Sequence, residues 1–190
     1  MLLEKLKWVS HQGEQSEACA IYSIDMHPDG SRFATGGGDN TIRIWDSRGL
    51  LEPWSEGEEE EEEDEAAPEE AGGGGGRRQQ LLAALANHAG GVLAVRFSHR
   101  GRYLASASDD QLIMIWELKP GEASSVPFGS TALPNKENWS RVFTLRGHSM
   151  DVLDVAWSPD DSKLASCSID NSVLVWGVRQ GARGRQHVLA

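Results

Sequence analysis

The segment His88–Trp116 reads HAGGVLAVRFSHRGRYLASASDDQLIMIW, and the segment His148–Trp176 reads HSMDVLDVAWSPDDSKLASCSIDNSVLVW. The two segments align over 29 residues without a gap, with a serine ten residues and an aspartate six residues before the final tryptophan. A copy nearer the N-terminus ends at Trp45 and keeps this spacing for Thr35 and Asp39. Fixed offsets within repeated segments indicate a repeat architecture.

Each copy contains short apolar runs separated by turn residues. Val, Ile, Leu and aromatic residues at near-alternate positions, bounded by Asp, Pro and Gly, are typical of strands and turns. A fourth run follows each final tryptophan after a connection, so every copy predicts a four-stranded antiparallel sheet, the blade of a β-propeller. The strands expected beyond the first copy are Leu81–Leu85, Val92–Phe97, Tyr103–Ser106, Leu112–Trp116, Arg141–Leu145, Val152–Trp157, Lys163–Ser168, Val173–Trp176 and Arg185–Leu189.

These strands predict an all-β fold, a partial propeller of about three blades over residues 1–190. The blades comprise residues 8–45 with strand 81–85, residues 88–145, and residues 148–189. A propeller needs roughly four to eight blades to close, so three blades predict either a longer polypeptide or self-association. The sequence ends where the histidine of another copy would be due, and we therefore expect it to be a truncated form of a longer protein.

The net charge of −11 arises in the first of two long connections, residues 46–80. Residues 56–70 hold 11 acidic and no basic residues, and the glycine run 72–76 follows. This low-complexity composition predicts a disordered insertion, either simply solvated or in electrostatic contact with a basic partner such as a histone. The other 18 acidic residues balance 18 Lys and Arg, which disfavours a nucleic-acid-binding surface on the blades. No Gly-Lys-Ser/Thr follows the glycines, so they are not a phosphate loop.

The second long connection, residues 117–140, is rich in Pro, Gly and Ser but contains Phe128 and Trp139. These aromatic residues are either anchors that pack the loop on the blade or contacts for a partner protein.

Cys19 and Cys167 form no disulfide framework, and Cys167 is predicted to be a small buried residue of a strand. Few cysteines and no signal peptide favour a reducing compartment, and no apolar run is long enough to span a membrane.

The copies resemble the WD40 repeat, which begins with Gly-His and ends with Trp-Asp. Gly147-His148 and Trp45-Asp46 keep these dipeptides. The resemblance implies a buried hydrogen-bonded set in each blade, made of the loop His, the Ser or Thr of the second strand, the turn Asp and the Trp of the third strand. The sets are His88, Ser106, Asp110 and Trp116; His148, Ser166, Asp170 and Trp176; and Thr35, Asp39 and Trp45, whose nearest histidine, His11, lies six residues too far away.

Ser, His and Asp together are also the components of a hydrolase triad. A nucleophile would not recur at identical offsets, each time with a tryptophan, and no G-x-S-x-G motif is present. The sequence also lacks a Cys/His cluster with metal-ligand spacing. We therefore predict no catalytic residue, no metal and no cofactor.

Several segments resemble more than a generic WD40 repeat. They are KWVSH from Lys7, IYSIDMHPDGSRFATGGGDNTIRIW from Ile21, SASDDQLIMIW from Ser106, FGS at Phe128, NKENW before TLRGH, and DVLDVAWSPDDSKLASCSIDNSVLVW from Asp151. Together they are similar to the N-terminal propeller of the HIRA family of histone chaperone subunits. The resemblance implies a seven-bladed propeller in a nuclear, multi-subunit complex that deposits histones H3-H4 independently of DNA replication. It implies other chaperone subunits and H3-H4 as partners, with histone contact direct or indirect. From charge and hydropathy we expect this segment to contact neither nucleic acid nor membrane.

Two other functions compete with this interpretation. The middle WD subunit of the replication-linked chromatin assembly factor has a similar propeller, and NKENW followed by TLRGH resembles it as well. Substrate receptors of cullin ubiquitin ligases carry a repeat that ends in Trp-Asp-x-Arg, which Trp45-Asp46-Ser47-Arg48 matches. In that case Arg48 would contact the ligase adaptor, and Arg48, Phe128 and Trp139 are the candidate partner contacts. A generic WD adaptor linked to RNA or tubulin is a further alternative.

Overall fold

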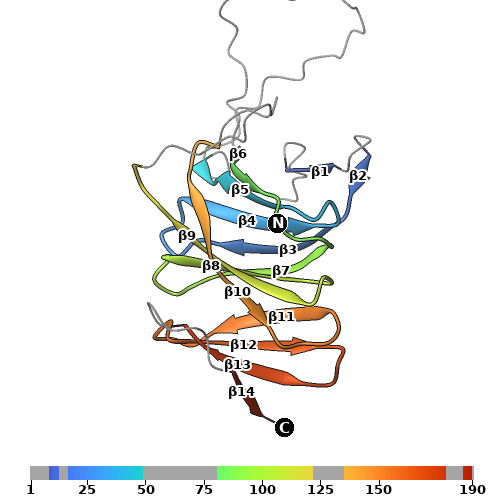
Figure 1. The fold of residues 1–190 in the computed structure, drawn as a ribbon. Coiled ribbons are helices and arrows are strands. Elements are labelled where there is room, and N and C mark those ends of the chain that lie inside the picture. The colour runs from blue at the N-terminus through green and yellow to red at the C-terminus, as the bar shows by residue number, and fades with distance from the viewer. Residues whose placement is uncertain (1–8, 13–16, 49–80, 122–134, 179–185, 190) are drawn as a thin grey trace, which may run out of the picture.

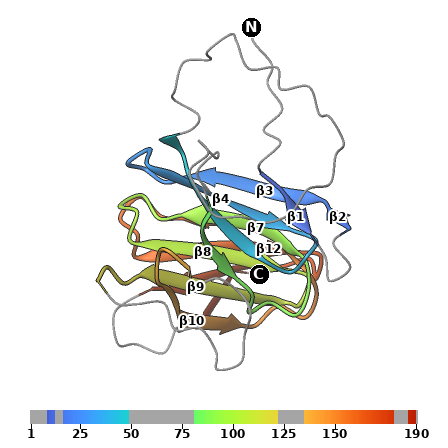
Figure 2. The ribbon, with the colours of Figure 1, turned by 90° about the horizontal axis from the view of Figure 1, so that it is seen from above.

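The computed structural model describes residues 9–12, 17–48, 81–121, 135–178 and 186–189 (Figure 1). Over these ranges its regular elements are strands, arranged as three four-stranded sheets and one two-stranded sheet. The sheets lie one above another (Figure 1), and in the view from above β7 to β10 spread in order across the second sheet (Figure 2). The predicted all-β fold with three four-stranded units is therefore confirmed.

Each four-stranded sheet is an antiparallel meander in which consecutive strands are neighbours. We refer to the three sheets as blades one, two and three. Blade one contains β3 (Ile21–Met26), β4 (Arg32–Gly37), β5 (Ile42–Asp46) and β6 (Leu81–Leu85). Blade two contains β7 (Val92–Phe97), β8 (Tyr103–Ser108), β9 (Leu112–Leu118) and β10 (Trp139–Arg146). Blade three contains β11 (Val152–Trp157), β12 (Lys163–Ser168), β13 (Val173–Gly177) and β14 (Gln186–Leu189).

The first strands of the blades lie side by side, β7 against β3 and β11 against β7. These strands are also the first edge of each sheet, so the blades meet along their first strands. The turn after each first strand contains a residue with positive φ, namely Gly30, Gly101 or Asp161. Glycine adopts this backbone conformation without strain, whereas aspartate does so at a cost.

Two apolar cores lie between the blades. Blade two serves both, because successive side chains of a strand point to opposite faces. Val95, Phe97 and Trp116 belong to the core shared with blade one, whereas Ala105 and Ile115 belong to the core shared with blade three. A sheet that is covered on both sides requires apolar residues on both faces of its strands.

The strand bounds differ from the predicted ones mainly at β9 and β10. The pairing of these strands continues as far as Trp139 opposite Leu118, so the strands include both ends of the segment 117–140 that the sequence predicted to be a loop. The ladder hydrogen bonds stabilise this extension beyond the point where the apolar alternation ends. The acidic and Gly-rich insertion lies outside the described residues, apart from its first residues at 46–48.

A short hairpin of β1 (His11–Gln12) and β2 (Ala18–Cys19) precedes blade one, with His11 paired to Cys19. The sequence predicted extra residues in this region but no strands. The hairpin absorbs those residues and brings His11 back over blade one, where a Cβ atom on Gly37 would overlap the histidine ring. Gly37 lacks that atom, and this absence lets the ring approach the strand so closely.

Candidate functional site

Each blade contains a set of polar side chains joined by hydrogen bonds. In blade two, Trp116 Nε1 donates to Ser106 Oγ at 3.0 Å. Ser106 Oγ lies 2.8 Å from His88 Nε2, and His88 Nδ1 lies 2.8 Å from Asp110 Oδ2. Asp110 also accepts backbone N–H groups from the loop before β7 and from the start of β9. One chain of bonds therefore joins β8, β9 and the loop that enters the blade.

The partners in this set, together with the neutral charge state of His88, assign the direction of each hydrogen bond. The indole N–H can only donate, and the ionised carboxylate can only accept. His88 therefore donates from Nδ1 to Asp110 and accepts at Nε2 from the Ser106 hydroxyl. The ring is then a neutral imidazole with its proton on Nδ1. Each polar atom in the chain is used, as burial requires.

Blade three repeats this arrangement with nearly the same distances. Trp176 Nε1 donates to Ser166 Oγ at 2.9 Å, Ser166 Oγ lies 2.8 Å from His148 Nε2, and His148 Nδ1 lies 2.9 Å from Asp170 Oδ2. Ser172 donates its hydroxyl to the same carboxyl group at 2.6 Å. The structure thus brings together all four residues of this set.

Blade one has a full set as well, because His11 occupies the place of the missing histidine. His11 Nε2 lies 2.8 Å from Thr35 Oγ1, and His11 Nδ1 lies 2.6 Å from Asp39 Oδ1. Trp45 Nε1 donates to Thr35 at 2.9 Å, and Arg43 donates to Asp39 at 2.9 Å. Counting offsets in the sequence missed His11, because the β1–β2 hairpin separates it from the blade.

The sets are held in defined charge states by their surroundings. Burial is the largest influence on His11 and His88 and lowers the pKa of both below 6.5, so the rings stay neutral. Burial also raises the pKa of Asp39 and Asp110, but hydrogen bonds from the histidines and from backbone N–H groups outweigh it. The pKa of each of these carboxyl groups is therefore below its ordinary value. The hydroxyl of Ser172 lowers the pKa of Asp170 further.

This arrangement is unsuited to nucleophilic catalysis. The Ser106 hydroxyl is fully buried and is shared between His88 and the Trp116 indole. A nucleophile needs room for a substrate carbonyl and an oxyanion hole beside it. A buried hydroxyl that already bonds an imidazole and an indole N–H has neither, and we therefore interpret the sets as stabilising the blades.

Hydrogen bonds also link one blade to the next. Asp25 on β3 accepts the backbone N–H of Phe97 on β7 at 2.7 Å, and Trp157 on β11 donates to the Arg96 carbonyl at 3.0 Å. At the turn after β7, the backbone N–H groups of His99 and Arg100 donate to the Asp161 carboxylate at 2.8 and 2.9 Å. These bonds fix the positions of neighbouring blades relative to one another.

The candidate partner contacts have different outcomes. The prediction that Trp139 contacts a partner is wrong, because its side chain is only 5% exposed. The ring lies against Phe97 with ring centroids 5.9 Å apart, and its Nε1–H donates to Glu137 at 2.8 Å. Trp139 instead anchors the end of the connection on the blade. Arg48 is 81% exposed and is paired with the Asp46 carboxylate of the same motif. Phe128 lies outside the described residues.

Cys167 is half-buried, so the prediction of a buried strand residue is wrong. It lies on the face of β12 opposite to the core shared with blade two. Ala107, at the equivalent position in blade two, is fully buried because blade three covers it.

Among the described residues no group of three or more His, Cys, Asp or Glu could hold a metal ion. No helix in the same part of the chain is long and apolar enough to cross a membrane.

The repeated sets and stacked blades define the chain as a WD40 β-propeller protein, and residues 7–46 match the model of the WD domain, G-beta repeat. Residues 70–189 match the model of the CAF1B/HIR1 beta-propeller domain. The chain therefore belongs to the CAF1B/HIR1 β-propeller family, which confirms the resemblance found in the sequence.

Similar proteins include Protein HIRA of Oryza sativa subsp. japonica, 46% identical over 95% of this chain, and Protein HIRA of Homo sapiens, 42% identical over 93%. Protein HIR1 of Cryptococcus neoformans is 42% identical over 93% of the chain. The chain spans only 16% to 18% of the length of these relatives. The crystal structure of RRP9 WD40 repeats matches 92% of this chain and 39% of that one, with a TM-score of 0.59 and 21% identity, and it supports the fold alone.

Proposed function

We propose that the chain is a non-enzymatic WD-repeat subunit of a nuclear histone chaperone complex that deposits H3-H4 independently of DNA replication. The observation that carries this proposal is the match to the CAF1B/HIR1 propeller model over residues 70–189, together with HIRA and HIR1 relatives that are 42% to 46% identical. Those relatives are far longer than this chain, so the proposal extends to it the role of one part of such a protein.

The architecture supports a role in binding rather than in chemistry. The hydroxyl groups of the three sets are consumed by hydrogen bonds inside the blades. The loops and turns at the blade ends remain for contact with other proteins, the usual role of loops on a rigid scaffold. Fold alone does not fix function, so the family match carries the assignment.

Affinity capture tests the proposal. The tagged chain, produced in the cells of its source organism, is purified from nuclear extract at physiological salt. We expect to recover H3-H4 and other subunits of a replication-independent chaperone. Recovery of the replication-linked assembly factor instead would favour the other branch of the family, and recovery of neither complex would refute the proposal.

The ubiquitin-ligase alternative has one supporting observation, the exposed Arg48 in Trp45-Asp46-Ser47-Arg48. Its pairing with Asp46 is sufficient to account for the arginine in that place. Arg48→Ala separates the two functions, because it should abolish capture of a ligase adaptor if the alternative holds and leave histone capture unchanged under our proposal. Lys163→Ala, another exposed cation of the blades, is the matched control.

A further inference from the structure

The first strands of the three blades share an irregularity. β3, β7 and β11 each have a bulge near the N-terminal end, where the register shifts after Ile21, Val92 and Val152. The bulged residues are Tyr22, Leu93 and Leu153. A bulge turns one side chain away from the alternation of its strand, and bulges are frequent beside functional sites.

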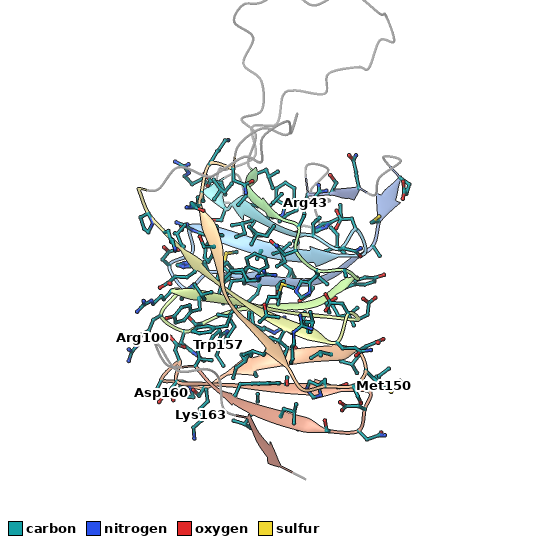
Figure 3. All side chains as sticks on the ribbon, viewed as in Figure 1. Arg43, Arg100, Met150, Trp157, Asp160 and Lys163 are labelled. Carbon is teal, nitrogen blue, oxygen red and sulfur yellow. The ribbon has the colours of Figure 1, made fainter. Side chains whose placement is uncertain are left out.

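These three residues lie on one rim of the blade stack, which we call the histidine rim. It consists of the N-terminal ends of β3, β7 and β11, the loops before β7 and β11 that carry His88 and His148, and the turns after β4, β8 and β12. Figure 3 shows Met150 at this rim and Arg100 at the opposite one. Because β3, β7 and β11 lie side by side, their bulged residues follow one another across the blades.

Apolar side chains are exposed on the histidine rim. Tyr22 is 54% exposed and Leu153 is 47% exposed, with Met150 and Ile169 exposed in the loops beside Leu153. The Tyr22 ring lies over Gly38 and Gly91, which have no side chains to cover it. Large apolar side chains that gather on an exposed surface mark a site of interaction with another protein.

Negative charge surrounds these apolar residues. Asp109 is exposed beside Gly90 and Gly91, and Asp151 lies in the loop next to Ile169. Asp110 and Asp170 of the hydrogen-bonded sets also lie at this rim, and the pKa of each of these carboxyl groups is lowered, so both are ionised. Asp39, the carboxylate of the third set, is paired with Arg43. In blade two Arg146 lies on this rim at the end of β10. β10 and β7 are opposite edges of the sheet, so Arg146 is distant from Leu93 on β7.

We propose that the histidine rim is a docking surface for a basic segment of a partner protein that places one apolar side chain against Tyr22, Leu93 and Leu153. Charge complementarity identifies this occupant, because an acidic rim attracts lysine and arginine while the exposed apolar residues provide an anchor point. The inference adds the contact surface and the charge of the partner to the proposed function and rests on it.

Two pairs of substitutions in the complete chain test the apolar anchor. The first is Tyr22→Ser with Leu153→Ser on the rim. The control is Ile24→Ser with Met26→Ser, because these residues are 62% and 47% exposed on β3 but point away from blade two. Their alternation with Ser23 and Asp25, which bond to β7, fixes that direction. Asp109→Asn with Asp151→Asn tests the charge, and Glu117→Gln at the far end of β9 is its control.

The probes are purified H3-H4 and a short synthetic peptide of alternating lysine and glycine with one central phenylalanine. We expect each rim pair to weaken peptide binding roughly tenfold, the controls to change it less than about twofold, and added salt to weaken it further. Unchanged peptide binding in both rim pairs overturns the inference. If H3-H4 binds equally to rim variants and controls, the docking surface is wrong while the proposed function stands. If the peptide binds in a rim-dependent way but H3-H4 binds neither the unchanged chain nor any variant, the docking surface stands and the proposed function fails.

Discussion

Removing the Thr35 hydroxyl is the sharpest test of how the blades are held together. The buried Thr35 Oγ1 lies 2.8 Å from His11 Nε2 and accepts the Trp45 indole N–H at 2.9 Å. Thr35→Val has nearly the same shape but leaves both of these buried groups without this partner. An unsatisfied buried group costs about 1–3 kcal/mol, so for two groups we expect a loss of about 2–6 kcal/mol in the free energy of unfolding.

Thr35→Ser is the matched control, because it removes a methyl group and keeps the hydroxyl that Ser106 and Ser166 supply in the other blades. Its expected cost is about 0.5–1.5 kcal/mol, as for the loss of one buried methyl group. Urea titration followed by tryptophan fluorescence measures both variants, with unchanged slopes showing that the transitions are comparable. If Thr35→Val costs no more than Thr35→Ser, the hydroxyl does not link His11 to Trp45 as the structure has it.

Three further predictions concern other parts of the account. Burial lowers the pKa of His11 and His88 below 6.5, so the unfolded chain binds more protons than the folded chain as the pH falls through that value. The free energy of unfolding should therefore be smaller at pH 5.5 than at pH 7.5. Equal values in urea titrations at the two pH values would contradict neutral rings in the folded chain. Asp161→Ala should destabilise the chain by about 1 kcal/mol more than Asp161→Gly in thermal unfolding. Both substitutions lose the bonds to blade two, but alanine keeps the backbone strain of φ = 59° and glycine relieves it. A more stable alanine variant would exclude backbone strain at this position. Trp116→Ala should cost about 3–5 kcal/mol through a cavity between blades one and two, and a denaturation midpoint close to the original would be incompatible with its burial.

Most of the fold follows from the sequence, because blade two and blade three obey simple rules of spacing. Val92–Phe97 and Val152–Trp157 have the bounds that the pattern predicts. Val92–Phe97 contributes apolar side chains to both cores, whereas Val152–Trp157 buries one face only. The fourth strand at Leu81–Leu85 was also predicted within its true bounds, although a long connection precedes it. Here the resemblance to a four-stranded blade compensated for the weak local signal.

The sequence was less informative where distant segments meet. His11 completes the set of blade one through a hairpin whose pairing no offset reveals, and the indirect signal was Gly37, which leaves room for the ring. For Trp139 the sequence left open an anchor on the blade or a partner contact, and the ladder with β9 places it in the core. Cys167 is only half-buried because burial depends on a neighbouring blade rather than on its own strand.

The histidine rim could not be identified from sequence at all. Tyr22, Leu93 and Leu153 read there as ordinary apolar strand residues, and the register shifts that turn them toward the rim are visible only in the paired strands. Their surroundings also depend on the loops of neighbouring blades, which bring the side chains of Asp109 and Asp151 to the same rim.

Hydrogen exchange of the indole protons measures the central claim directly, namely that three tryptophans close buried sets in three successive blades. The resonances of Trp45, Trp116 and Trp176 are followed by NMR after transfer to deuterated buffer. The account predicts that all three protons exchange as slowly as the amide protons of the central strands, since each is bonded to a buried hydroxyl. Exchange of these protons at the rate of a free indole would contradict it.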